Sequence, residues 1–337
     1  MFTSVLPVSM VFADFFINIV NFLGRIQAYF SFAAIPVNVL IIILSVWKVP
    51  NCLVKTYTLN ISIATLVAVT YSTSYFSIVY FDPKWLKPMN ISLGHLPFVV
   101  DNFLSYLAIN VYYFQSTVTM TLAYINYKRL FFFQNVSRKK STYIPFSVGF
   151  GMAATMALCQ TFEIMQTRFE LSHSIAVVLA CLRAATQIMV VLVTVGFYVL
   201  TVIQSVTHAC QAQMGRIRQS RWNVYRSVLL HCFVPNLFFW LSIPDSLCSA
   251  AMSLTATSVE GLSNFDLFCV HIYAVTQYMN PPRLFMISST VLLAFEEYRR
   301  AILELLKTPF KCCLHMNQDK NSSVSTEVTS EVSSSAE

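Results

Sequence analysis

Apolar residues fill seven long windows of the chain, and charged or turn-forming residues separate these windows. A helix that crosses the hydrocarbon core of a bilayer needs about 20 mostly apolar residues. The windows are Ile26–Trp47, Tyr57–Phe81, Phe98–Ile125, Tyr143–Phe162, Ile175–Ile203, Ser227–Ala251 and Asp266–Leu293. The pattern therefore predicts an all-α membrane protein built as a seven-transmembrane helix bundle.

A further apolar stretch, Phe2–Leu23, precedes the first window and contains the polar residues Asp14, Asn18 and Asn21. Only two residues, Gly24-Arg25, separate it from Ile26, which is very short for the turn of a transmembrane hairpin. The start of the chain also lacks the basic residues of a signal peptide. We interpret residues 1–25 as an interfacial helix or an extracellular extension of the first span.

Composition supports a lipid environment, because 56% of the 337 residues are hydrophobic and only 11% are charged. Soluble domains carry about 25% charged residues, so a soluble enzyme, a disordered protein and a nucleic-acid-binding protein are all disfavoured. The nine cysteines form no CxxC pair, which argues against a zinc site or a disulfide framework. No catalytic, metal or phosphate-binding motif is present, and we expect no enzyme activity and no cofactor.

The basic residues predict how the bundle is oriented. The segments after the first, third and fifth windows hold eleven Lys and Arg residues, and those after the second, fourth and sixth hold three. Basic loops stay in the cytosol, so the N-terminus is expected outside and the C-terminus inside. The net charge of +7 is then mostly an excess at the inner face. Asn90, in the sequon Asn90-Ile91-Ser92, falls in a predicted outer loop and is the candidate glycosylation site.

Local motifs give this plan a family resemblance. Pro36–Ile41 resembles the Gly-Asn-x-Leu-Val pattern of the first span in rhodopsin-like receptors, with Asn38 as the buried polar residue. Leu59–Leu66 resembles the second-span motif, although Thr65 stands where that family has Asp. Asn126–Arg129 occupies the place of Asp-Arg-Tyr, and Phe295–Leu303 resembles the start of an amphipathic eighth helix.

The chain thus resembles the nematode serpentine chemoreceptors, a divergent group of rhodopsin-like seven-transmembrane G-protein-coupled receptors. The class bc and class x types both remain open. The usual Cys at the outer end of span three is absent from Gly94–Ser105, so the familiar disulfide to the second outer loop is not expected. In that family an Asn-Pro pair in span seven precedes the eighth helix at a fixed spacing. In this chain that spacing leads back from the eighth helix to Ser288 and Ser289, whereas Asn280-Pro281 lies about two turns earlier, so the role of Asn280 stays open.

The resemblance implies a chemosensory receptor in the plasma membrane of sensory cells. Its implied partners are a small odorant or pheromone-like ligand, a heterotrimeric G protein, an arrestin-like protein and membrane lipid. Pro235 and Pro281 are the implied hinges. The candidate ligand-binding residues are Asp101, Tyr106, Tyr113, Arg183 and Trp240, and the candidate G-protein-coupling residues are Asn126, Tyr127, Lys128, Arg129, Arg216 and Arg218.

Several of these candidates have a structural alternative. Arg183 could meet an acidic ligand, pair with Glu163 or snorkel to the interface. Asp101 could bind an amine or simply be solvated at the mouth of span three. The tyrosines could line a pocket or pack the bundle, and Pro235 could mark a static kink instead of a hinge.

The remaining segments follow the bundle of residues 26–293. Residues 294–311 are expected to form the amphipathic eighth helix, and Cys312 and Cys313 behind it are candidates for palmitoylation. The tail 312–337 is rich in Ser and Thr and is expected to be disordered in the cytoplasm. The rival interpretation is a seven-span ligand-gated ion channel of the insect odorant or gustatory receptor type, whose N-terminus lies in the cytosol.

Overall fold

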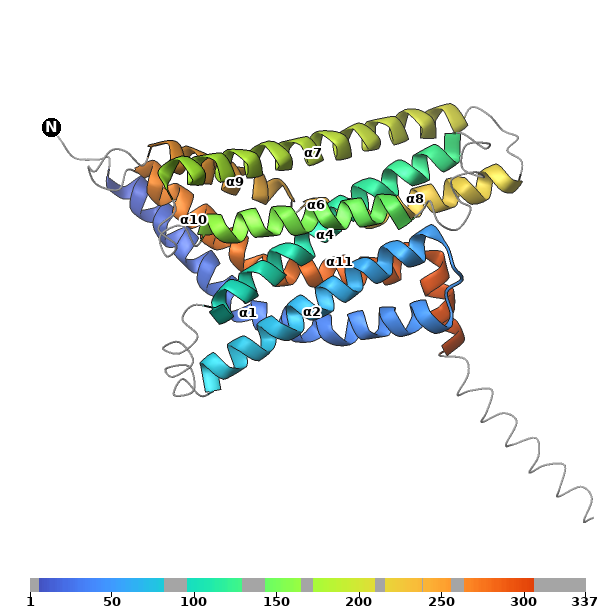
Figure 1. The fold of residues 1–337 in the computed structure, drawn as a ribbon, viewed down its shortest axis with the longest axis horizontal. Coiled ribbons are helices and arrows are strands. Elements are labelled where there is room, and N and C mark those ends of the chain that lie inside the picture. The colour runs from blue at the N-terminus through green and yellow to red at the C-terminus, as the bar shows by residue number, and fades with distance from the viewer. Residues whose placement is uncertain are drawn as a thin grey trace, which may run out of the picture.

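The computed structural model describes residues 6–81, 96–128, 143–164, 172–209, 216–237, 239–255 and 264–305, and every element in these ranges is a helix. The helices lie side by side in one elongated bundle (Figure 1). They are α1 (Leu6–Trp47), α2 (Leu53–Phe81), α4 (Leu96–Lys128), α6 (Tyr143–Ile164), α7 (His173–Ala209), α8 (Arg216–Leu237), α9 (Phe239–Thr255), α10 (Asn264–Tyr278) and α11 (Asn280–Ala294). A short helix of residues 296–305 follows α11.

Helix α1 continues through the predicted boundary at Gly24-Arg25 and is 42 residues long. The N-terminal apolar stretch is therefore an extension of the first helix, as one of the two interpretations expected, from Leu6 onward. Gly24 lies inside this helix, where a Cβ atom would stand 3.5 Å from the ring of Tyr278. Position 24 is therefore a packing contact between α1 and α10, where a Cβ atom would stand at ordinary van der Waals distance.

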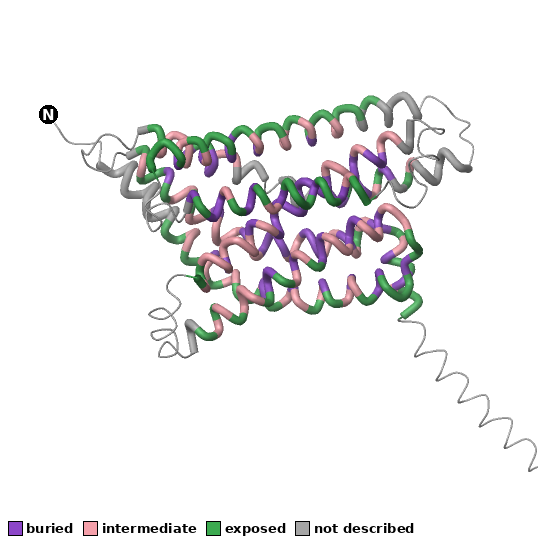
Figure 2. Tube along the Cα trace, viewed as in Figure 1, coloured by how far each residue is buried: buried purple, intermediate pink, exposed green. Residues whose placement is uncertain are grey.

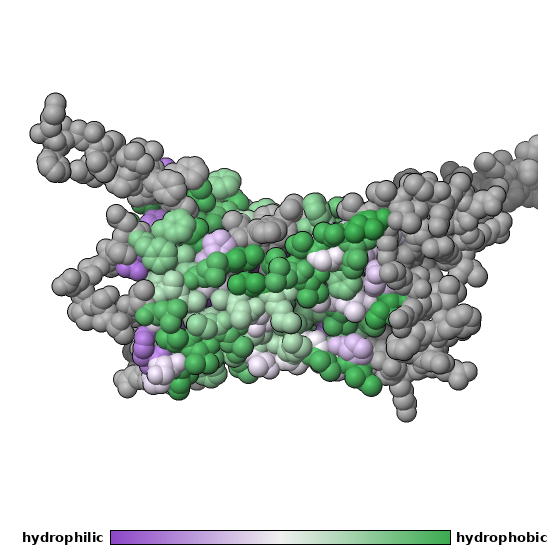
Figure 3. Space-filling view, turned by 90° about the horizontal axis from the view of Figure 1, so that it is seen from above, coloured by the Kyte–Doolittle hydropathy of each residue, from purple (hydrophilic) through white to green (hydrophobic). Residues whose placement is uncertain are grey.

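Four helical segments in the described part of the chain are long and apolar enough to cross a membrane. They are Ile17–Trp47, Leu53–Ile78, Tyr143–Glu163 and His173–Leu200. These segments indicate a membrane-embedded protein. Large apolar side chains also cover the outer side of α7, among them Val178, Leu182, Met189, Leu192 and Val199, and the face of the bundle in Figure 3 is mainly hydrophobic.

The other three predicted spans are not among the helices that are both long enough and apolar enough to cross a membrane. The helices explain why in each case. Helix α4 is long but carries many polar residues. The sixth window is divided between α8 and α9, and the seventh between α10 and α11, so each half is too short or too polar when it is counted alone. The count of seven spans stays a prediction.

Helix α4 occupies the centre of the bundle, where it packs against α2, α6, α7, α8 and α11 (Figures 1 and 2). Its polar side chains point to these neighbours. The Asn110 amide donates to Gln160 Oε1 at 2.8 Å, and Gln115 donates to the Phe146 carbonyl at 2.8 Å. A helix enclosed by protein can satisfy polar groups that lipid could not, which explains its lower apolar content.

The junction between α10 and α11 is a bend within a continuous hydrogen-bonded path. Met279 keeps right-handed helical angles, with φ −80° and ψ −11°. Its N–H donates to Val275 O at 3.0 Å, and its carbonyl accepts from the Arg283 N–H at 3.0 Å. Pro281 and Pro282 fall in the first turn of α11, where the missing N–H groups are least costly. The predicted hinge Pro281 therefore lies at the bend.

The predicted hinge Pro235 lies in the last described turn of α8. Its side chain lies outside the described part of the structure. The hinge role of Pro235 stays a prediction.

A polar seam joins α1, α2 and α11 to the helix of residues 296–305. Ser288 donates to Asn38 Oδ1 at 2.9 Å. Ser288 is one of the two serines that stand, by their spacing from the eighth helix, where the family has its Asn-Pro pair. Asn280 instead donates to Gln277 Oε1 at 3.3 Å. The buried Tyr298 hydroxyl bonds Ser45 Oγ at 2.6 Å and also reaches the Thr58 hydroxyl.

Candidate functional site

Three charged side chains, Arg183, Glu163 and Asp245, meet near one end of the bundle, and we call them the charged triad. Arg183 Nη1 donates to Glu163 Oε1 at 3.3 Å and to Oε2 at 3.4 Å, while Nη2 donates to Asp245 Oδ2. The side chains are 4%, 6% and 2% exposed, respectively. Arg183 thus pairs with Glu163, as one interpretation expected, and does not snorkel to the surface.

Each member of the charged triad comes from a different helix. Glu163 stands in the last turn of α6, Arg183 lies three turns into α7, and Asp245 follows Pro244 in α9. The Ser249 hydroxyl donates to Glu163 one turn beyond Asp245. The triad therefore links α6, α7 and α9 through ion pairs between side chains that are almost fully buried.

A disulfide between Cys248 and Cys269 joins α9 to α10 beside the charged triad, with 5.2 Å between the two Cα atoms. We call this end of the bundle the disulfide end, and the opposite end, where Tyr298 lies, the Tyr298 end. The expectation that the cysteines form no disulfide framework is wrong for this pair. The 21-residue separation resembles no short motif, and the bond arises because α9 and α10 are antiparallel neighbours.

A cavity of about 430 Å³ opens against the charged triad, and we call it the triad cavity. Besides the triad it is lined by Cys248, Ser249, Met252, Ser253, Cys269, Val270 and Tyr273. Two carboxylates share a single guanidinium, so its described lining has a formal charge of −1. Buried paired charges next to an open cavity mark a place where a polar ligand could exchange partners with the protein.

A second cavity of about 290 Å³ surrounds Asp101 at the same end of the bundle, and we call it the Asp101 cavity. It is lined by Gln27, Ser31, Ala68, Val69, Ser72, Phe76, Phe98, Asp101, Asn102, Ser105, Tyr273, Gln277, Tyr278, Asn280, Pro281 and Leu284. Tyr273 belongs to both cavities and separates them. Asp101 is only 9% exposed, so the interpretation of a solvated carboxylate at the mouth of the span is wrong.

The other candidate ligand-binding residues are placed differently. Tyr106 and Tyr113 are buried and belong to neither described cavity lining. The Tyr106 hydroxyl accepts a hydrogen bond from Gln277, next to the Asp101 cavity, whereas the Tyr113 ring packs 5.6 Å from that of Tyr112. Trp240 stands in the first turn of α9, and its side chain lies outside the described part. Of the five candidates, Arg183 and Asp101 therefore line cavities.

Sequence reasoning overlooked Asp245, although a signal for it exists. An ionisable residue inside an apolar window is costly and usually has a partner, and this rule drew attention to Arg183 but was not applied to the acidic residue in the sixth window. No cluster of three or more His, Cys, Asp or Glu side chains among the described residues could hold a metal ion.

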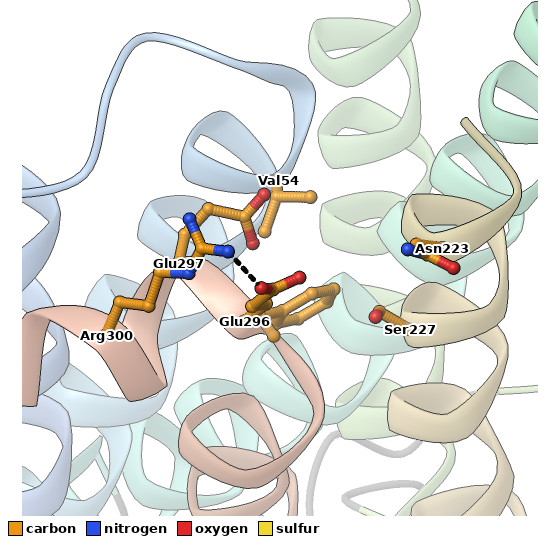
Figure 4. Close-up of a pocket in the computed structure, with 7 residues that line it drawn as sticks. Val54, Asn223, Ser227, Glu296, Glu297 and Arg300 are labelled. Atoms are coloured by element: carbon orange, nitrogen blue, oxygen red, sulfur yellow. Dashed lines mark hydrogen bonds and ion pairs between the residues drawn. The ribbon is translucent and has the colours of Figure 1, made fainter. Parts of the chain in front are cut away.

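A third cavity, of about 230 Å³, lies at the Tyr298 end between α2, α8 and the helix of residues 296–305. Figure 4 shows Glu296 and Glu297 on one wall, with Arg300 paired to Glu296, and Asn223 and Ser227 on the facing wall. Val54 and Phe295 complete the lining. This is the end to which Lys48, Lys55 and the last residues of α4 belong.

The candidate coupling and modification sites are largely outside the described structure. Asn126, Tyr127 and Lys128 end α4, and Arg216 and Arg218 begin α8, but their side chains are not described. Asn90, Arg129, Cys312 and Cys313 lie outside the described residues. Their predicted roles stay predictions.

Comparison with known proteins adds no relative. No protein-family model matches the chain, and no curated protein is significantly similar to it. The three cavities, the charged triad and the pattern of the sequence are therefore what bears on function.

Proposed function

We propose that the protein is a G-protein-coupled chemosensory receptor with seven membrane spans and its disulfide end outside the cell. A small odorant or pheromone-like molecule enters this end from outside. Helix movement then changes the Tyr298 end, where a heterotrimeric G protein binds. The proposal applies the resemblance described above to the two ends of the bundle.

The observation that carries the proposal is the charged triad beside its cavity. A ligand changes a conformational equilibrium only through different affinities for the two conformations. A polar ligand in the triad cavity competes for Arg183, Glu163 or Asp245, and each of these contacts holds α6, α7 and α9 in one arrangement. Weakening one contact therefore favours an arrangement in which α9 is displaced from α7.

A physical connection leads from α9 to the Tyr298 end. Helix α8 directly precedes α9 in the chain, and its residue His231 packs its ring 5.5 Å from Tyr57 and 5.2 Å from Phe295. Phe295 and Tyr57 belong to the base of the bundle near the third cavity. A shift of α8 would repack these aromatic rings and widen or close that cavity.

Two independent features support the orientation. Disulfides persist on the extracytoplasmic side of cell membranes, which favours the Cys248–Cys269 end as the outer end. The excess of basic residues falls in the segments at the other end, as expected for cytoplasmic loops. The candidate coupling residues, from Asn126 to Arg129 and at Arg216 and Arg218, belong to that basic end.

The first test is topology. An epitope tag at Met1 is expected to be labelled on intact, unpermeabilised cells, and a glycosidase-sensitive mobility shift is expected to disappear in Asn90→Gln. A tag that is labelled only after permeabilisation would contradict the receptor and favour the ion-channel alternative.

The second test is signalling. Cells that express the protein with a G-protein dissociation reporter are exposed to a broad panel of small volatile and water-soluble molecules. At least one ligand is expected to activate the reporter, and Arg216→Ala with Arg218→Ala is expected to reduce activation without reducing surface expression. A ligand-gated current in the absence of G-protein activation would refute the proposal.

A further inference from the structure

The Asp101 cavity combines one acidic side chain with a lining that has no positive counterpart. Among the residues described as lining it there is no Lys, Arg or His, and the other polar residues are neutral: Gln27, Ser31, Ser72, Asn102, Ser105, Tyr273, Gln277, Tyr278 and Asn280. Asp101 Oδ1 has no hydrogen-bond partner within the described part of the chain. The triad cavity differs, because there a guanidinium already stands between the carboxylates.

The Asp101 carboxylate has a side-chain hydrogen bond with Ser72, but its buried Oδ1 atom has no partner in the described part of the chain. A buried negative charge that is met by one neutral hydroxyl alone is costly, because burial removes most of its hydration. The cost is offset either by a proton or by a cation that enters the cavity. A cation is the better match to this lining, since the neutral amide and hydroxyl oxygens around Asp101 can accept further hydrogen bonds from it.

Aromatic rings decide which kind of cation fits. Phe76, Phe98, Tyr273 and Tyr278 all line the cavity. Aromatic faces attract ammonium groups through the ring quadrupole, and their bulk is unsuited to the compact oxygen cage that a metal ion requires. A volume of about 290 Å³ also far exceeds what a bare ion fills.

We infer that the Asp101 cavity binds a small organic ammonium ion, with Asp101 as the counter-ion and the four aromatic rings around its apolar part. The inference rests on the proposed receptor function in one respect, which is that the ligand enters the cavity from outside the cell. It adds to the triad cavity of that receptor a second ligand site, which takes protonated amines. Tyr273, which is shared with the triad cavity, then contacts both the amine and the wall of the charged triad.

The test uses the purified full chain in lipid nanodiscs at pH 7.4 and three probes of similar shape: 2-phenylethylamine, 2-phenylethanol and 3-phenylpropanoate. Thermal unfolding and isothermal titration calorimetry measure binding. The amine is expected to raise the unfolding temperature, and the neutral alcohol and the acid are not. A charge-assisted hydrogen bond contributes about 1.5–3 kcal/mol, so Asp101→Asn is expected to weaken amine binding at least tenfold.

Two controls make the result specific. Asp266→Asn removes an acid from the first turn of α10 that is absent from the described lining, and it is expected to leave amine binding unchanged. Unliganded Asp101→Asn is expected to unfold at the same temperature as the parent or higher, because a neutral amide is less costly to bury than an unpaired carboxylate. If Asp101→Asn lost binding because it misfolded, the unliganded variant would unfold at a lower temperature than the parent.

Several results would overturn the inference. They are equal stabilisation by the amine and the alcohol, amine binding that survives Asp101→Asn, or an equal Asp101-dependent shift produced by Na⁺ in an amine-free buffer. Failure of the receptor proposal is separate: binding of the amine without any G-protein activation would refute that proposal alone. Absence of amine binding in a protein that still responds to other odorants would refute the amine inference alone.

Discussion

Removing the positive member of the charged triad should destabilise the bundle more than any other single charge change. Arg183→Met keeps an apolar stem of similar length but leaves Glu163 and Asp245 buried without a counter-charge. All three side chains are at most 6% exposed, so solvent screening is slight. At 3.3 Å and an effective dielectric constant of about 20, one charge pair contributes about 5 kcal/mol before desolvation is counted.

Breaking a buried pair by removing one partner costs about 3–5 kcal/mol, and we expect a loss in this range. For a chain of 337 residues, an unfolding entropy of about 2.1 cal/mol/K per residue makes 1 kcal/mol correspond to about 1.4 °C, so the unfolding temperature should fall by about 4 °C or more. Arg183→Met combined with Glu163→Gln and Asp245→Asn removes all three charges, and it should recover most of the loss because neutral amides can bond one another.

A thiol-reactive fluorophore measures this unfolding in detergent, since Cys232 is fully buried and reacts only when the bundle opens. All variants also carry Ser at the other cysteines outside the disulfide, which removes the background from their thiols: Cys52, Cys159, Cys181, Cys210, Cys312 and Cys313. The matched control is Arg226→Met, at an exposed position of α8, for which a change below about 0.5 kcal/mol is expected. Equal stability of Arg183→Met and Arg226→Met would refute the reasoning, and so would a triple variant less stable than Arg183→Met.

Three further predictions use the same unfolding assay. Tyr298→Phe loses two hydroxyl partners and should cost about 1 kcal/mol; an unchanged temperature would contradict the polar seam. Gly149→Val should destabilise the bundle by about 1–3 kcal/mol, because a Cβ atom added at Gly149 would already lie 3.4 Å from the Val118 side chain and valine adds two more methyl groups. Gly151→Val should leave stability unchanged, because no atom lies within 4 Å of a Cβ atom added there. Equal effects of the two substitutions would argue against this packing. Cys248→Ser with Cys269→Ser opens a link across 21 residues and should cost about 3 kcal/mol. When unfolding is followed by circular dichroism, because a reductant would react with the thiol probe, a reductant should give the same loss in the parent but none in the variant.

Helix positions follow from the sequence because apolar length is a local property. The window Tyr57–Phe81 becomes α2 over Leu53–Phe81, and Tyr143–Phe162 becomes α6 over Tyr143–Ile164. A charged residue is costly to bury in lipid, so it ends both the apolar window and the helix within it. The predicted windows and the observed helices therefore agree within a few residues. The junction at Met279 was foreseeable only as a proline position, because a proline can either bend a helix or end it.

Long-range pairs could be predicted only in part. Glu163 was foreseen as a partner of Arg183 because both lie at neighbouring ends of consecutive windows, 20 residues apart. Asp245 lies 62 residues from Arg183, and only the packing of α7 against α9 brings them together. The disulfide was missed for the same reason, since cysteine spacing along the chain says nothing about which helices become neighbours.

The central position of α4 has a consequence for how the protein enters its membrane. In the proposed seven-span arrangement, a segment that carries Asn110, Gln115, Ser116 and Thr119 must leave the insertion machinery for lipid, where each polar group is costly. The partners Gln160 and Phe146 belong to α6, which is synthesised later. Helix α4 should therefore wait beside the translocation channel until α6 emerges, and biogenesis of this protein should proceed by pairs of helices.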